Sequence, residues 1–271
     1  MSIVRSWKAW VFTLGTEVVS GRVVNTNAAY LGRRLTLLGF NVLGVVSLID
    51  DVKLISEFIS YVLTSKPDLL VTTGGLGPTY DDVTLEAVAK ALRVELRLNE
   101  EALKSIREKY DVLKLPLTPE RVKMAYMPAG SEVIPNNIGT APGCMVRSGE
   151  TLIISLPGVP RELENMWESY VEPRLRELGV RRVFAERSFI VSGVPESSAA
   201  KIVKEILRKY ENTYIKTHPK GHEISAPLLE VYVQVFSDDL SSAERTADEV
   251  LDELKKGLES VGGVITRSEV R

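Results

Sequence analysis

The stretch of residues 68–84, DLLVTTGGLGPTYDDVT, constrains the fold of this chain more than any other segment. Its apolar start is typical of a buried strand, and the glycines that follow are typical of a tight turn. The residues after the turn predict a helix over residues 79–92. A strand, a glycine-rich turn and a helix in this order begin a βαβ unit, in which the turn lies at the carboxyl edge of a parallel sheet, where ligands bind.

The glycine-rich turn is suited to binding a phosphate. Residues without a Cβ allow backbone N–H groups to point inward and a phosphate to come close, and the first turn of the predicted helix adds its free N–H groups. The candidate binding residues are Gly74, Gly75, Gly77, Pro78 and Thr79.

Two carboxylates follow the turn, Asp81 and Asp82. They would repel a bare phosphate but suit one that arrives with Mg²⁺, which accepts carboxylate and phosphate oxygens together. The alternative is that they only complement the dipole of the predicted helix. The segment is neither a P-loop, because Gly77 is followed by Pro78 and not by lysine, nor the dinucleotide fingerprint G-x-G-x-x-G.

In the N-terminal part of the chain, strand-like apolar runs alternate with segments that have the apolar periodicity of a helix. Apolar runs at residues 9–14, 41–48 and 68–73 predict strands, and the segments 26–38 and 52–64 predict helices between them. This alternation predicts an α/β fold with three layers, α/β/α, around a mostly parallel sheet. Further helices are expected at 100–110, 120–125 and 160–178, and further strands at 132–134, 143–146 and 151–155.

The pattern changes near residue 180. A strand at 183–191, a helix at 197–210, strands at 213–216 and 228–236 and a helix at 241–261 are expected. This β-α-β-β-α order predicts a small α+β domain. We therefore expect two domains, residues 1–178 and residues 180–271.

The composition excludes several classes of protein. The net charge is −2, and residues 180–271 contain 14 basic and 15 acidic residues, so we expect no nucleic-acid partner. Cys144 is the only cysteine, which excludes an intrachain disulfide, and its apolar surroundings predict that it is buried. Without a signal peptide or an 18-residue apolar run, the chain is expected to be cytoplasmic, with no membrane partner.

A second candidate segment, GTEVVSGRVVNTNAAYL, follows the first strand. Glu17 is a candidate metal ligand or base at the same sheet edge. Three neutral residues at the start of the next helix are hydrogen-bonding candidates, with simple N-capping as the alternative reading for the first two. They are Asn25, Thr26 and Asn27.

Two later segments, GTAPG and LPGVPREL, offer further turns. Gly139, Thr140 and Gly143 form a turn that can wrap a phosphate or a ribose, or that is a plain connection to the next strand. Gly158 precedes a second helix that can face the same cleft, and Glu162 lies in the first turn of that helix, where its charge also complements the dipole.

The segment YIKTHPKGH contains both histidines, His218 and His222. Pro219 and Gly221 prevent the helix that would bring the two rings together on a metal, so a solvated loop is expected. That loop can carry Lys216 and Lys220 to a phosphate, which is a hypothesis.

These four segments of the N-terminal part, TTGGLGPTYDD included, resemble the CinA family, whose N-terminal domain is similar to the molybdopterin-binding domains of MogA, MoaB and MoeA. The resemblance covers residues 7–178. It implies a metal-dependent pyrophosphatase that cleaves ADP-ribose, a small nucleotide, to AMP and ribose 5-phosphate, with Asp81, Asp82 and Glu17 holding the divalent ion. The family more often carries Asp where this chain has Thr16. A direct role of position 16 at the site is therefore doubtful, and Glu17 is the stronger candidate.

The resemblance leaves two alternatives open. One is a protein of molybdenum cofactor biosynthesis that binds molybdopterin through the same turn, with Asp82 assisting adenylyl transfer. The other is a non-catalytic nucleotide-binding module. Nothing after Gly179 resembles the amidase domain of full-length bacterial CinA proteins, so no amidase activity is expected. Related domains are often oligomeric, so a homodimer is expected.

Overall fold

The structure, a computed structural model, describes residues 7–178, 183–220 and 227–270. The chain divides into two compact units, one made of residues 1–36 and 40–180 and the other of residues 37–39 and 181–271. The buried residues of each core cluster come from one unit alone. Each unit therefore has its own hydrophobic core.

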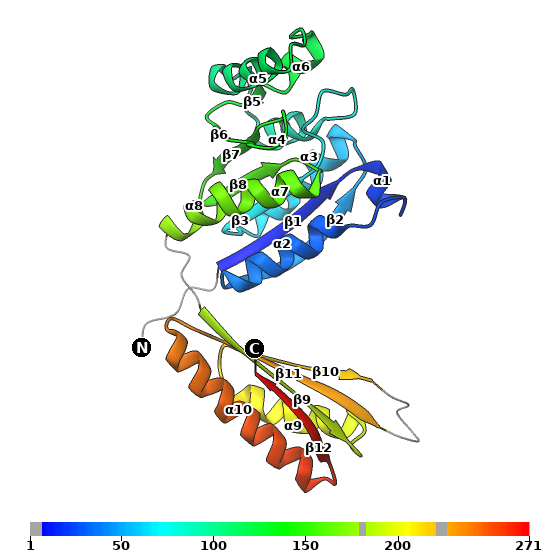
Figure 1. The fold of residues 1–271 in the computed structure, drawn as a ribbon. Coiled ribbons are helices and arrows are strands. Elements are labelled where there is room, and N and C mark those ends of the chain that lie inside the picture. Colours follow the sequence, from blue (N-terminus) through cyan, green and yellow to red (C-terminus); the bar gives the residue numbers. More distant parts are fainter. Residues whose placement is uncertain (1–6, 179–182, 221–226, 271) are drawn as a thin grey trace. The chain divides into compact units, whose positions relative to one another are not determined.

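The first unit is built on a six-stranded sheet (Figure 1). The first four strands in spatial order are parallel to one another, and each of the last two pairs antiparallel with the strand before it. The predicted mostly parallel sheet is therefore confirmed. In spatial order the strands are β2 (Phe40–Leu48), β1 (Trp7–Leu14), β3 (Leu69–Thr73), β8 (Thr151–Leu156), β7 (Gly143–Ser148) and β6 (Glu132–Ile134).

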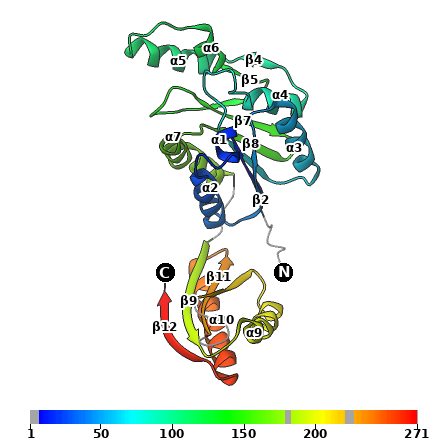
Figure 2. The ribbon, with the colours of Figure 1, turned by 90° about the vertical axis from the view of Figure 1, so that its right-hand side faces the viewer.

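Helices cover both faces of this sheet (Figures 1 and 2). On one face, apolar side chains of two helices pack against β1, among them Ile55, Ile59 and Val88. These helices are α3 (Val52–Thr64) and α4 (Thr84–Leu92). On the other face lie α2 (Thr26–Leu37) and a helical segment made of α7 (Pro160–Met166), the π-helical turn η1 (Trp167–Val171) and α8 (Glu172–Glu177). The three-layer α/β/α prediction is confirmed.

A smaller layer adds a second core cluster to this unit, around Ile106 and Met127. It contains a two-stranded antiparallel pair that the sequence analysis did not predict, because strands of three residues carry too little periodicity. Its elements are β4 (Leu96–Leu98), β5 (Tyr126–Pro128), α5 (Glu100–Val112) and α6 (Pro119–Lys123). Cys144 is buried in the same cluster, as predicted, and burial raises the pKa of its thiol to about 12.

The prediction of a helix over residues 79–92 is wrong at its start. The helix α4 begins only at Thr84, because hydrogen bonds tie Thr84 to the glycine turn. Its N–H donates to Gly75 O at 3.2 Å, and its hydroxyl donates to Gly74 O at 2.7 Å. Asp81 and Asp82 therefore precede the helix and do not lie in its first turn.

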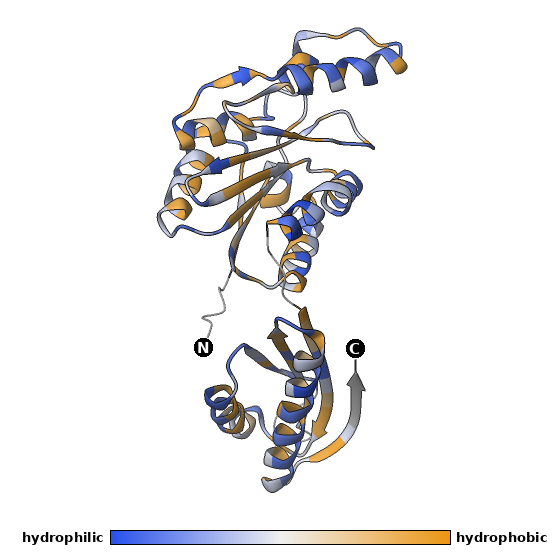
Figure 3. Ribbon diagram, turned by 90° about the vertical axis from the view of Figure 1, so that its left-hand side faces the viewer, coloured by the Kyte–Doolittle hydropathy of each residue, from blue (hydrophilic) through white to orange (hydrophobic). Residues whose placement is uncertain are grey.

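The second unit has the four-stranded antiparallel order β10 (Thr213–Pro219), β11 (Leu228–Ser237), β9 (Val183–Ser192) and β12 (Val264–Val270). Its helices are α9 (Glu196–Lys209) and α10 (Leu240–Ser260), and hydrophilic and hydrophobic positions alternate along them (Figure 3). The predicted β-α-β-β-α order is present, and β12, which was missed, extends it by one strand. The strand predicted at 213–216 is present and continues to Pro219, so the solvated loop predicted for the segment 214–222 is wrong up to residue 219, because those residues pair with β11.

The short helix α1 (Thr16–Val19) follows β1 in the first unit. In the described part of the chain, no helix is both long enough and apolar enough to cross a bilayer.

Candidate functional site

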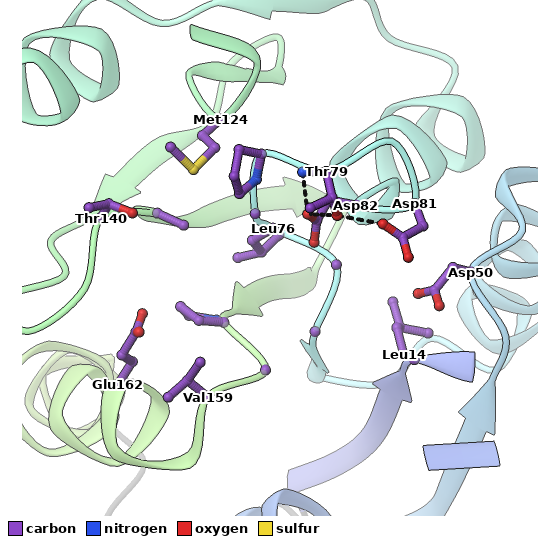
Figure 4. A pocket seen from close by; sticks show the side chains of 18 of the residues that line it. Leu14, Asp50, Leu76, Thr79, Asp81, Asp82, Met124, Thr140, Val159 and Glu162 are labelled. Carbon is purple, nitrogen blue, oxygen red and sulfur yellow. Dashed lines mark hydrogen bonds between the residues drawn. The ribbon is translucent and has the colours of Figure 1, made fainter. Parts of the chain in front are cut away.

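A cleft of about 580 Å³ opens in the first unit beyond the carboxyl ends of β1, β3 and β8 (Figure 4). Segments far apart in the sequence meet there. Its lining includes Gly15, Glu17, Asp50, Gly74, Gly75, Gly77, Pro78, Thr79, Asp81, Asp82, Met124, Thr140, Gly158 and Glu162. The cleft thus brings together most of the residues singled out in the sequence.

The hydroxyl of Thr79 lies between the carboxylates of Asp81 and Asp82 (Figure 4). Asp82 Oδ2 accepts from Thr79 Oγ1 at 2.6 Å and from Thr79 N at 2.8 Å, and Asp81 Oδ1 accepts from the same hydroxyl. These contacts fix both acids on one turn. The bond from Thr79, then that of its own backbone N–H, and the nearby Lys123 hold the pKa of Asp81 below its usual value.

Three glycines, two that line the cleft and one beside it, leave room for a carboxylate. A Cβ at Gly15 would lie 2.6 Å from Glu17 Oε1, and one at Gly77 would lie 2.6 Å from Asp82 Oδ2. A Cβ at Gly139 would lie 2.1 Å from Glu162 Oε2. Real Cβ atoms do not approach other atoms so closely, so each glycine allows an acid to lie against the backbone.

Gly74 and Gly75 are glycines for a different reason, which lies in the backbone. Gly74 has φ of 103°, and a Cβ there would lie 2.0 Å from the backbone oxygen of Leu14. Gly75 has φ of 65°, and a Cβ there would lie 2.4 Å from Thr84 Oγ1. Both positions favour glycine through backbone conformation and close approach, independently of any phosphate.

Asp50 is a cleft residue that the sequence analysis missed. It follows β2, and its Oδ2 accepts from the N–H of Thr16 at 2.8 Å and from the hydroxyl of Thr16 at 2.9 Å. Thr16 therefore supports a carboxylate at the cleft rather than supplying one. The only signal in the sequence was an acid directly after a strand that ends at the same sheet edge.

Asn25, Thr26 and Asn27 lie beside the main cleft and line an adjoining cavity of about 80 Å³. The Asn25 amide donates to Thr13 Oγ1 at 2.9 Å, and its carbonyl accepts from Ala28 N at 3.1 Å, as an N-cap does. The Asn27 amide donates to Thr73 Oγ1 at 3.0 Å and to Gly158 O at 2.8 Å. Both asparagines therefore hold the walls of the site together.

Asn136, a second missed residue, shapes the opposite wall. It is buried, donates to Glu162 Oε2 at 2.7 Å and to Ala141 O at 2.9 Å, and accepts from Gly139 N at 2.7 Å. These bonds orient Glu162 and the turn that carries Thr140. Gly143 is not part of the lining: it begins β7, where a Cβ would lie 2.8 Å from the Ser155 backbone oxygen, so its place is explained by packing.

The lining is rich in negative charge. Its ionisable residues are Glu17, Asp50, Asp81, Asp82 and Glu162, and no lysine, arginine or histidine is among the lining residues that the structure describes. Two lysines outside this lining contact residues in it or beside it: Lys123 Nζ donates to Thr79 O, and Lys109 Nζ donates to Asn136 O at 2.6 Å. Burial lowers the pKa of Lys109, against the opposing effect of Glu162.

The histidine segment lies in the other unit. Lys216 and His218 lie in β10 and are exposed, and Lys220 pairs with Glu230 at 2.9 Å. His222 lies outside the described residues. The hypothesis that this segment contacts a phosphate stays a prediction.

The oxygen donors of the cleft fit a small hard cation. In the described ranges no group of three or more Asp, Glu, His or Cys side chains converges closely enough to hold a metal ion. Mg²⁺ often takes one or two protein carboxylates and completes its shell with water and substrate phosphates. Asp81 and Asp82, which share one hydroxyl proton from Thr79, form such a pair.

Residues 10–177 match the family described as "Probable molybdopterin binding domain". The match spans more than half of the chain, and the chain belongs to this family. The predicted relation to molybdopterin-binding domains is confirmed.

Individual relatives cover more of the chain. A protein of Pyrobaculum aerophilum is 44% identical over 246 residues, 91% of this chain and 92% of its own. A protein of Aeropyrum pernix is 44% identical over 262 residues, 97% of both chains. The crystal structure of "the protein CinA with unknown function" from Thermoplasma acidophilum is similar with a TM-score of 0.57 and 42% identity, over 61% of this chain and 98% of that one. The resemblance to CinA is thus confirmed for part of the chain.

Proposed function

We propose that this protein is a metal-dependent nucleotide pyrophosphatase that hydrolyses ADP-ribose, or a similar dinucleotide diphosphate, to AMP and a sugar phosphate. The observation that carries the proposal is the pair Asp81 and Asp82, fixed by Thr79 on a turn that lines a cleft of about 580 Å³. A cleft of this volume is in the range of small-molecule sites.

In this proposal, residues on one wall of the cleft bind the metal ion, and a residue on the opposite wall takes part in proton transfer. Asp81 and Asp82 would hold the divalent ion, and Asp50 lies on the same side of the cleft (Figure 4), which Glu17 of α1 also lines. When bound, the ion neutralises negative charge on the diphosphate. Glu162, which accepts from Asn136 on the opposite wall, would take up a proton from the attacking water. The water oxygen forms a new bond to one phosphorus, the bond from that phosphorus to the bridging oxygen breaks, and the bridging oxygen leaves on the other phosphate, so that each product carries one phosphate.

The alternative is a molybdopterin-binding protein that acts in cofactor biosynthesis, and the family match favours it. Under this alternative the same turn holds the phosphate of the pterin, and Asp82 assists adenylyl transfer. A non-catalytic nucleotide-binding module is a weaker candidate, because five carboxylates line the cleft and four of them accept hydrogen bonds from Thr16, Thr79 or Asn136, which is more than binding alone requires.

The test is incubation of the full chain with ADP-ribose, FAD, NAD or ATP, with and without Mg²⁺, Mn²⁺ or Co²⁺, followed by measurement of AMP. We expect metal-dependent AMP release from ADP-ribose and a loss of about 100-fold or more in Asp82→Asn, because the variant loses a charge that acts in the transition state. The exposed Asp252→Asn, in α10 of the other unit, is the matched control. No AMP from any compound would reject the proposal and favour the pterin alternative, tested by titration with molybdopterin.

A homodimer and a cytoplasmic location stay predictions. Sedimentation of the purified protein at several concentrations measures the first.

A further inference from the structure

We propose that Lys123 is a ligand-binding residue of the cleft: its ammonium group binds the phosphate of a metal–diphosphate ligand beside the acid pair. This inference rests on the proposed function for the class of ligand, a diphosphate, and does not depend on whether the diphosphate is cleaved.

The position of Lys123 supports this role. It is the last residue of α6, and the next residue, Met124, lines the cleft. Its Nζ donates to the backbone oxygen of Thr79, the residue whose hydroxyl joins the two acids. The lysine therefore reaches from the smaller layer onto the turn that carries Asp81 and Asp82.

The donor capacity of Lys123 is not used up by that bond. An ammonium group has three N–H donors. Among the described residues, Thr79 O is the acceptor with which Lys123 Nζ forms a hydrogen bond. The remaining donors are available to an anion at the acid pair, and the side chain is only half-buried.

The charge of the cleft requires such a group. The ionisable residues that line it are five carboxylates. A divalent ion shared by Asp81, Asp82 and the diphosphate offsets only part of their combined negative charge, and Glu17, Asp50 and Glu162 also repel the diphosphate. A cation at the edge of the acid pair offsets this repulsion at the point where the phosphate must approach.

The alternative is that Lys123 only holds the turn. The two roles predict different signs for two affinities. If Lys123 binds phosphate, its removal weakens anion binding but strengthens the binding of a bare cation, because a positive charge beside Asp81 disappears. If it only holds the turn, its removal disorders Asp81 and Asp82 and weakens both.

The experiment compares wild type, Lys123→Met, Lys123→Arg and the control Lys104→Met by calorimetry, with Mn²⁺ alone and with inorganic pyrophosphate in the presence of Mg²⁺. Lys104 is exposed on α5 and pairs with Glu108 at 4.0 Å, so its removal changes charge without touching the cleft. For Lys123→Met we expect about tenfold or greater loss of pyrophosphate affinity, as for a lost charge-assisted hydrogen bond. We also expect Mn²⁺ to bind several-fold more tightly. Lys123→Arg should keep most of the pyrophosphate affinity.

Three results would overturn the inference. They are wild-type protein that does not bind pyrophosphate, Lys123→Met that binds it as wild type does, and Lys123→Met that loses affinity for both Mn²⁺ and pyrophosphate. The assay separates this inference from the proposed function, since a wild type that binds pyrophosphate through Lys123 but releases no AMP would keep the first and reject the second.

Discussion

Several glycines at this site leave space, through their missing side chains, for nearby carboxylates to lie against the backbone. Gly15, Gly77 and Gly139 each leave room for an acid, and Gly74 and Gly75 serve the backbone. The glycine-rich sequence was interpreted as a cradle for phosphate, and that role stays a prediction. Substitution of each glycine should affect activity and stability differently, because the new Cβ would meet a different atom at each position.

Gly139→Ala should lower activity with little effect on stability. The new Cβ would meet the end of the Glu162 side chain, which can move, and Gly139 has no left-handed φ that would strain an alanine. We expect AMP release to fall about 10- to 100-fold, since a displacement of about 1 Å can cost that much. Thermal unfolding and steady-state rates measure the two effects.

The control is Gly32→Ala, in the interior of α2, where a Cβ meets no atom within 4 Å. It should raise the free energy of unfolding by roughly 0.5–1 kcal/mol and leave AMP release unchanged. A Gly139→Ala protein with full activity would show that the position of Glu162 is unimportant.

At the scale of elements, α2 and α8 are joined through the carboxylate of Glu172. It accepts from Arg34 Nε at 3.1 Å, from Arg176 Nη2 at 2.9 Å and from Trp167 Nε1 at 3.2 Å. Burial raises the pKa of Glu172, but the bonds from Arg176 and Arg34 outweigh burial and lower it. Because α2 carries Asn27 and α7 carries Glu162, this link holds together the helices that support the cleft.

The lowered pKa of Glu172 predicts how this link depends on pH. A depressed folded-state pKa stabilises the protein above the unfolded value, about 4.3, and this stability is lost as the pH falls through the folded-state pKa. Glu172→Gln should therefore be about 1–2 kcal/mol less stable than wild type at pH 7, and the difference should shrink below about pH 4. Urea unfolding at several pH values measures it.

The exposed Glu177→Gln, which loses a bond from Arg174 at 3.1 Å, is the control and should cost less than about 0.5 kcal/mol. A stability difference for Glu172→Gln that stays constant down to pH 3 would contradict the pKa argument.

At the scale of the whole molecule, the two units have separate cores, and the cleft lies in the first of them. Nucleotide with Mg²⁺ should therefore stabilise the first unit alone, by RT ln(1 + [L]/Kd), about 2.7 kcal/mol at a ligand concentration 100 times Kd. Hydrogen exchange with and without ligand measures this by segment. Equal added protection of α9 and α10 would contradict it.

Much of the architecture was predictable from the sequence, because the periodicity of apolar residues is a local property. The strands and helices of residues 7–73 follow it closely, since each element buries one face against a neighbour. Prediction failed in two places outside this pattern. The helix α4 starts late because Thr84 donates to the glycine turn, and β12 was missed because it is an edge strand that leaves an apolar residue, Val264, exposed.

The sequence by itself determined the α/β class, the carboxyl edge as the place of the site and the acid pair that follows the glycine turn. Only the tertiary structure decided which charges share the cleft. Asp50 follows β2 and Glu162 lies in α7, and no spacing along the chain relates either of them to Asp81, or relates Lys123 to Thr79, whose oxygen it contacts. Their meeting depends on the order and register of strands in the sheet, which are set by packing between segments distant in sequence.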